Sequence, residues 1–225
     1  MVDLKRSASV LGNRLIACNG ACADVEHDAA AGIPPRCLFF QPRGTARGAV
    51  VVGLNPGRMG QAEQQYLLAR EVTYSATVDY WREQLIRCDR YYRRMEQLID
   101  VLRIHGSIWW TELAKCQSRP ETKRLSEQTL RRCRRQFLGS ELDAVPADWP
   151  VVAAGRQAFE ATAYLLPDRA VLGVPHPTGS YGGWPLRDGS FPADLQEVAD
   201  SWLASTEPLA VWLTSASSGR REPIR

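Results

Sequence analysis

The chain has 225 residues, and its 28 lysines and arginines stand against 25 aspartates and glutamates, for a formal net charge of +3. This balance excludes a histone-like or polybasic protein that binds its partners by bulk charge alone. Hydrophobic residues make up 44% of the chain and charged residues 24%, which is typical of a soluble globular protein. We therefore expect a single domain over residues 1–214, followed by a small, polar, basic and disordered tail over 215–225.

No apolar stretch approaches the ~20 residues that span a bilayer, and the first residues do not lead into the apolar segment of a secretory signal. We therefore expect a cytoplasmic protein with no membrane partner. Six cysteines in that compartment are expected to be reduced. Metal binding or plain burial, rather than a disulfide framework, must then account for them.

Short apolar, β-branched runs alternate with longer segments of helical periodicity. Strands are predicted at 49–52, 107–111, 151–154 and 170–174. Helices are predicted at 77–103 with a break near Arg90, at 126–138 with Gly139 as its cap, at 156–166 and at 192–203. This alternation predicts an α/β fold, a three-layer α/β/α sandwich around a central, mostly parallel four-stranded sheet.

Three of the predicted strands end in unusual polar loops, at 53–57, 111–116 and 176–184. In open sheets of this kind the functional groups lie at the carboxyl ends of the strands, so we expect the loops to converge on one cleft. Each loop alone is a weak signal. A Gly-x-Asn-Pro-Gly segment is first of all a turn, and a single histidine in a loop is more often structural than catalytic.

Three motifs together resemble the uracil-DNA glycosylase superfamily. They are Gly-Leu-Asn-Pro-Gly at 53–57, Trp-Thr-Glu-Leu-Ala-Lys-Cys at 110–116 and Val-Pro-His-Pro at 174–177. The first resembles the water-activating loop of the mismatch-specific and single-strand-selective branches, and the second resembles a segment of the iron–sulfur branch. The third resembles the loop that enters the minor groove. The resemblance covers roughly residues 15–203 and is closest to the iron–sulfur branch.

The resemblance implies a monofunctional DNA glycosylase, which flips a nucleotide out of the duplex and hydrolyses its N-glycosidic bond. Asn55 would hold the attacking water, and His176 would stabilise the base as it leaves with negative charge. The backbone of the Gly53-Leu54 segment would contact the base or a phosphate. Tyr74 would stack on the flipped base, with Tyr66 as the alternative and core packing as the competing interpretation.

Glu112 departs from the iron–sulfur branch, which has an asparagine that reads uracil at this position. An ionised carboxylate only accepts hydrogen bonds, so it suits a base edge that carries donors. Glu112 therefore puts uracil specificity in doubt and favours an altered base, such as a modified cytosine or a deaminated purine. The alternative is that Glu112 points elsewhere and pairs with a nearby arginine.

The resemblance also implies four ligands for a 4Fe-4S cluster, namely Cys18, Cys22, Cys116 and Cys133. The N-terminal pair has one residue more between its cysteines than the branch's Cys-x-x-Cys. Four thiolates also suit structural zinc, which stays as the alternative. Cys37 is the reserve ligand, and Cys88 on the apolar stripe of the long helix is expected to be a core residue.

DNA is the expected partner of a monomer. The basic residues are mostly arginines, with only three lysines, and many of them lie on the helices around 82–135. Such patches neutralise phosphates, although a solvated helix face balanced by acids is the competing interpretation. The expected DNA contacts are Lys115, Arg119, Pro177 and Tyr181, the last filling the gap left by the flipped base. The alternatives to an enzyme are a catalytically weak damaged-base binder of the same fold and a zinc-stabilised interaction module.

Overall fold

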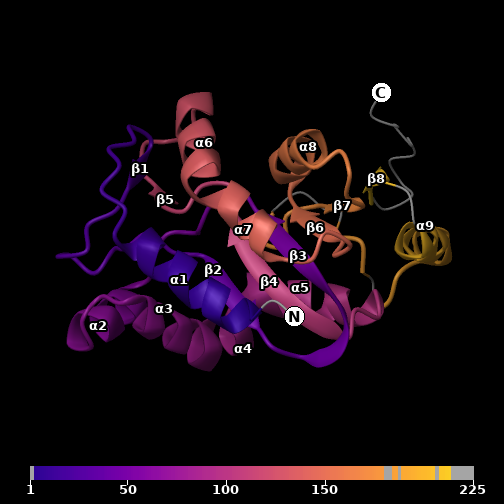
Figure 1. Cartoon of the computed structure of the whole chain (residues 1–225), viewed down its shortest axis with the longest axis horizontal. Helices are drawn as coiled ribbons and strands as arrows, with labels where there is room; N and C mark the ends of the chain where they lie inside the picture. Colours follow the sequence, from indigo (N-terminus) through magenta and orange to yellow (C-terminus); the bar gives the residue numbers. More distant parts are fainter. Residues whose placement is uncertain (1–2, 180–183, 187–188, 206–207, 214–225) are drawn as a thin grey trace. The chain divides into compact units, whose positions relative to one another are not determined.

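The structure is a computed structural model, and it describes residues 3–179, 184–186, 189–205 and 208–213. The chain has a mixed α/β fold with a central, mostly parallel sheet that is flanked by helices, so the predicted fold class is confirmed (Figure 1). No helix in the described part of the chain combines the length and the apolar character needed to cross a bilayer.

The central sheet has six strands in the order β2-β4-β3-β6-β7-β8. The strands are β2 (Leu38–Gln41), β3 (Gly44–Gly53), β4 (Gly106–Glu112), β6 (Val151–Ala154), β7 (Val171–Val174) and β8 (Ala210–Trp212). The four predicted strands are confirmed, but the predicted number of strands is wrong, because the sheet also contains β2 and β8 at its two edges. A separate antiparallel pair joins β1 (Val25–Glu26) to β5 (Gln117–Ser118).

The apolar runs of the inner strands are buried, as the sequence pattern indicates. Every residue of β6 and β7 is buried, and so are the last six residues of β3. β3, β6, β7 and β8 pair in parallel, with Val50 opposite Val151 and Val152 opposite Leu172. A parallel sheet covered on both faces favours continuous apolar strands of this kind.

The chain forms two compact units. The first contains Met1–Phe40, Leu54–Arg87 and Trp110–Pro146, and the second contains Gln41–Gly53, Cys88–Trp109 and Ala147–Arg225. Helices of the first unit include α1 (Leu4–Ile16), α2 (Gln61–Ala69), α3 (Tyr74–Tyr80) and α6 (Glu127–Cys133). Helices of the second include α5 (Arg90–Val101), α8 (Arg156–Leu165) and α9 (Ala193–Ala204).

The predicted long helix over 77–103 is divided. A π-helical turn (Trp81–Leu85) and a short helix α4 (Ile86–Cys88) follow α3, and α5 then begins at Arg90. Asp89 separates α4 from α5 and caps α5, because its carboxylate accepts a hydrogen bond of 2.7 Å from the backbone N–H of Tyr91. The break expected near Arg90 is therefore confirmed.

The predicted cap at Gly139 is wrong. After α6 the chain continues through a second π-helical turn (Arg134–Leu138) into α7 (Gly139–Ala144). Gly139 has helical backbone angles, with φ −56° and ψ −54°, and helical geometry ends only at Val145. A glycine in the right-handed helical region continues a helix, whereas a C-terminal cap needs the left-handed region.

Candidate functional site

The loop after β3 is fastened to the segment that follows β4. The backbone N–H of Ala114 donates a hydrogen bond of 2.9 Å to the carbonyl oxygen of Leu54, and buried Gly53 ends β3. The side chain of Asn55 donates from Nδ2 to Ser118 Oγ at 3.0 Å and to the carbonyl oxygen of Pro56 at 3.1 Å. Both bonds use the amide nitrogen, so the amide oxygen Oδ1 is the atom that can accept a hydrogen bond from a water.

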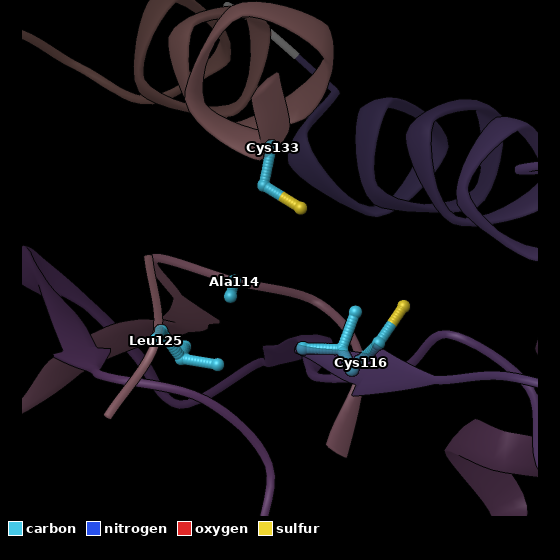
Figure 2. Packing of buried hydrophobic residues seen from close by; sticks show 5 residues of the cluster. Ala114, Cys116, Leu125 and Cys133 are labelled. Carbon is cyan, nitrogen blue, oxygen red and sulfur yellow. The ribbon is translucent and has the colours of Figure 1, made fainter. Parts of the chain in front are cut away.

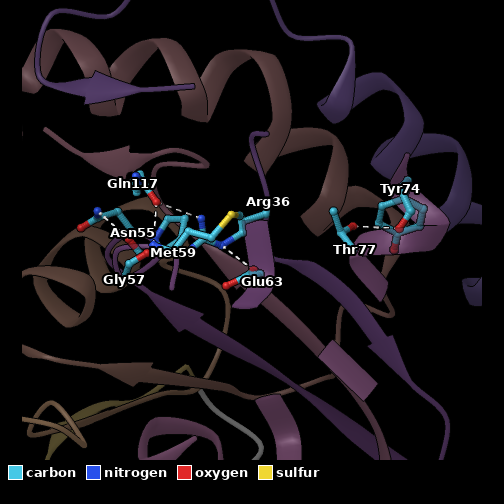
Figure 3. A network of polar contacts seen from close by, with 9 residues as sticks. Arg36, Asn55, Gly57, Met59, Glu63, Tyr74, Thr77 and Gln117 are labelled. Atoms are coloured by element: carbon cyan, nitrogen blue, oxygen red, sulfur yellow. Dashed lines mark hydrogen bonds and ion pairs between the residues drawn. The ribbon is translucent and has the colours of Figure 1, made fainter. Parts of the chain in front are cut away.

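Arg36, which the sequence reasoning missed, organises the polar side chains around this loop (Figure 3). It is only 6% exposed. Its guanidinium donates to Gln117 Oε1 at 3.2 Å and to the carbonyl oxygen of Gly57, and its Nε lies 3.4 Å from Glu63 Oε1. Gln117 Oε1 also accepts from the backbone N–H of Met59 at 2.8 Å. The buried guanidinium thus holds three groups, and these contacts fix the loop in place.

Glu112, the last residue of β4, is a buried acid of the first unit. It is 7% exposed, and its Oε2 atom has no hydrogen-bond partner among the residues that the structure describes. Burial raises the pKa of Glu112 to about 8, although the charges of Lys115 and Arg36 act in the opposite direction. Glu112 is therefore mostly uncharged at neutral pH, which corrects the expectation of an ionised carboxylate.

His176 belongs to the second unit, in the loop after β7. Its Nδ1 accepts a hydrogen bond of 3.3 Å from the backbone N–H of Thr178 and lies 3.1 Å from Thr178 Oγ1. The ring packs 5.5 Å from the ring of Tyr91, and the loss of solvent around it lowers the pKa of His176 below its ordinary value. A neutral imidazole that accepts at Nδ1 carries its proton on Nε2. His176 thus offers an Nε2–H donor.

Helix α5 holds this loop through a second residue. The guanidinium of Arg94 donates to the carbonyl oxygen of Pro177, and it lies 5.7 Å from the ring centre of Trp184. Pro177 itself is buried. Tyr181, expected to fill the gap left by a flipped base, lies outside the described residues.

The four cysteines predicted as ligands lie in one neighbourhood of the first unit. Cys116 and Cys133 belong to a buried cluster with Val25, Ala114 and Leu125, and Cys22 packs against it. Figure 2 shows the sulfur atoms of Cys116 and Cys133 directed into the space between α6 and the segment after β4. Burial and the proximity of the Cys133, Cys18 and Cys22 thiols raise the pKa of Cys116. The sequence alone could not show that these four side chains converge.

A metal would have to draw these thiols closer together. No group of three or more His, Cys, Asp and Glu side chains in the described residues has the arrangement of a finished metal site. The donor set nevertheless fits a four-thiolate cluster or zinc, because four thiols converge and two side-chain nitrogen atoms lie within hydrogen-bond reach of their sulfur atoms. His27 Nδ1 lies 3.7 Å from Cys116 Sγ, and Arg132 Nη1 lies 3.9 Å from Cys22 Sγ. Neither contact was expected from the sequence.

The remaining two cysteines lie elsewhere. Cys37 is buried beside Glu112, and that burial together with the Glu112 charge raises the pKa of its thiol. It is also one of the few non-glycine residues with a left-handed backbone, at φ 70°. Cys37 thus belongs to the Glu112 group. Cys88 is exposed at the end of α4, so its predicted place in the core is wrong.

Two expected site residues are core residues instead. Lys115 is 0% exposed, and its ammonium lies 2.8 Å from Glu141 Oε2 and donates to Thr111 Oγ1. This placement corrects the expectation that Lys115 contacts DNA. Tyr74 is also buried, with its hydroxyl donating to the carbonyl oxygen of Leu38 at 3.0 Å, so its ring is not available to stack on a base.

Two other candidates keep accessible side chains. Tyr66 is half-buried, and its ring lies 3.9 Å from the guanidinium of Arg70. Arg119 is exposed, and its backbone N–H donates to the carbonyl oxygen of Asp24 at 3.0 Å. Asn55 and His176, the two expected catalytic residues, belong to different units.

The chain matches no model of a known protein family and no curated protein. The likeness to the glycosylase superfamily is therefore carried by the three short motifs alone.

Proposed function

We propose that the protein is a monofunctional DNA N-glycosylase that hydrolyses the bond between a deoxyribose and an altered base. The observation that carries this proposal is the hydrogen bond from the Thr178 backbone N–H to His176 Nδ1. It favours the neutral tautomer with a proton on Nε2, which suits a group that must donate to a departing anion.

In the proposed mechanism the base leaves as an anion from a sugar that resembles an oxocarbenium ion. His176 donates from Nε2 to the base, and this bond strengthens as negative charge develops there. Asn55 holds the water through Oδ1, with its amide nitrogen anchored on Ser118 and the Pro56 carbonyl. An amide is a poor base, but a dissociative reaction needs the water positioned more than deprotonated.

The proposed cofactor is a 4Fe-4S cluster on Cys18, Cys22, Cys116 and Cys133, with structural zinc as the alternative. When bound, it would link the N-terminal segment, the loop after β4 and α6 covalently. Thiols whose pKa values are raised by burial and by one another become thiolates once a cation offsets the repulsion. Arg132 and His27 would then donate to two of the sulfurs.

DNA is the proposed partner of a monomer, and a cytoplasmic location belongs to the same proposal. Arg119 is exposed, as are the neighbouring basic residues Lys123, Arg124 and Arg132. Side chains of this kind bind phosphates, so we expect the affinity for DNA to fall steeply as salt increases.

The test is single-turnover excision from duplex and single-stranded oligonucleotides that each carry one altered base, read as strand scission after alkali. Asn55→Ala and His176→Ala are expected to lower the excision rate by about 10²-fold or more. His105→Ala is the matched control, because His105 is an exposed histidine outside the motifs, and it should cleave like the wild type. DNA binding with no scission across the whole panel would replace the glycosylase by a damaged-base binder.

A further inference from the structure

Glu112 has a buried carboxyl oxygen, Oε2, without a hydrogen-bond partner among the described residues. A buried polar atom without a partner costs free energy, roughly 1–3 kcal/mol. Such an atom normally persists where a ligand or a water completes its hydrogen bonding. Glu112 Oε2 is buried and has no partner among the described residues, and the residue lies at the carboxyl end of β4. In parallel α/β sheets this end is the binding edge.

The two cations near Glu112 are already engaged by other groups. Lys115 Nζ is bonded to Glu141 and Thr111, and the guanidinium of Arg36 is bonded to Glu63, Gln117 and the Gly57 carbonyl. The hydrogen bonds and ion pairs of both cations are therefore made with groups other than Glu112. Another titratable neighbour among the described residues is the thiol of Cys37, which burial keeps protonated. The surroundings therefore favour the uncharged carboxylic acid over the carboxylate.

The charge state of this side chain decides what it can do beside a departing base. A carboxylate would repel the negative charge that develops on the base and would raise the barrier to bond cleavage. An uncharged acid presents an O–H donor as well as a carbonyl acceptor. A hydrogen bond from that O–H to a base carbonyl oxygen would strengthen as charge accumulates on the oxygen.

We propose, resting on the glycosylase function proposed above, that Glu112 recognises the base as an uncharged acid and donates from Oε2 to a carbonyl oxygen of the base. Its ionisation then switches excision off. Glu112 is in this sense a pH-sensitive specificity residue. A carboxylate and a base carbonyl oxygen both only accept hydrogen bonds, whereas an uncharged carboxylic acid can donate to that carbonyl oxygen.

The experiment compares single-turnover excision of uracil and of hypoxanthine at pH values from 6 to 9 by the wild type and by Glu112→Gln. Glutamine keeps a donor and an acceptor at every pH. With a pKa of about 8, the uncharged fraction of Glu112 falls from about nine tenths at pH 7 to about one tenth at pH 9. The wild-type rate should therefore fall about tenfold over this interval, whereas the Glu112→Gln rate should stay within about twofold. Glu121→Gln, at an exposed glutamate, should keep the wild-type profile.

Ionisation of Glu112 can also be measured without any excision. Its pKa is raised in the folded state, so the free energy of unfolding of the wild type should fall relative to that of Glu112→Gln as the pH rises from about 4.5 to about 8. It should level off above this window. If Glu112→Gln does not fold, the wild-type rate profile alone decides, and a rate that does not fall between pH 7 and pH 9 overturns the proposal.

The outcomes separate this inference from the proposed function. Excision by the wild type with parallel pH profiles for wild type and Glu112→Gln overturns the role of Glu112 and leaves the glycosylase function standing. Excision restricted to bases without a carbonyl group on the recognised edge also overturns the role of Glu112 and leaves the glycosylase function standing. No excision of any base by the wild type removes the proposed function, and this inference falls with it.

Discussion

Replacing Lys115 by methionine should destabilise the fold strongly, because this lysine is half of a buried ion pair. Lys115 and Glu141 have side-chain exposures of 1% each, and Nζ lies 2.8 Å from Glu141 Oε2. Methionine fills much the same volume but leaves the Glu141 carboxylate buried without its cation. The other carboxylate oxygen, Oε1, already has no partner among the described residues. Removing one partner of such a pair costs about 3–5 kcal/mol of unfolding free energy.

The assay is urea unfolding followed by far-ultraviolet circular dichroism, which gives the free energy of unfolding of each variant. Arg131→Met is the matched control, since it removes an exposed pair with Glu127 on α6 and should cost less than about 0.5 kcal/mol. The double variant Lys115→Met, Glu141→Leu should recover most of the loss. A loss for Lys115→Met no larger than that of the control would refute the reasoning. It would also reopen a DNA-contacting role for Lys115.

Two further predictions concern the first unit. Protein prepared anaerobically should absorb near about 400 nm if the cluster is iron–sulfur, and Cys133→Ser should abolish this absorbance while Cys37→Ser retains it. A colourless wild type with bound zinc would contradict the iron–sulfur assignment. Gly12→Ala should destabilise the fold by about 1–3 kcal/mol through overpacking, because an added Cβ would lie 2.2 Å from the Tyr74 ring. Gly60→Ala is its control, because a Cβ added at Gly60 would have no atom within 4 Å. Equal free energies of unfolding for the two variants would contradict the prediction, since they would mean that α1 shifts to accept the added Cβ at no cost.

The fold was predictable where apolar runs are long and continuous. Each of the four inner strands contains such a run, and glycine or proline closely follows β3, β6 and β7, so the strands and their mostly parallel arrangement follow from the pattern. The two edge strands were not counted in the predicted sheet for a physical reason. β8 has only three half-buried residues, and β2 has only four, two of which are not fully buried. Short segments of this kind are held by their neighbours rather than by their own pattern.

The candidate site was only partly predictable, because a motif fixes residue types but not the direction of side chains. The sequence could name four cysteines but could not show that they converge, nor that Cys37 lies beside Glu112. Lys115 carries a charge and was expected at the surface, yet a partner 26 positions along the chain allows it to be buried. Arg36 lies outside every motif, and its role depends on contacts between distant segments.

The most direct test of the central claim is the mass of the oligonucleotide after incubation with the wild-type protein. We expect a strand carrying an altered base to lose the mass of that base and gain a hydroxyl group, which marks an abasic site. His176→Ala should leave the strand intact over the same time, whereas His105→Ala should not. The claim that this chain is a DNA glycosylase would be contradicted if every strand in the panel of bases kept its full mass after incubation with saturating wild-type protein.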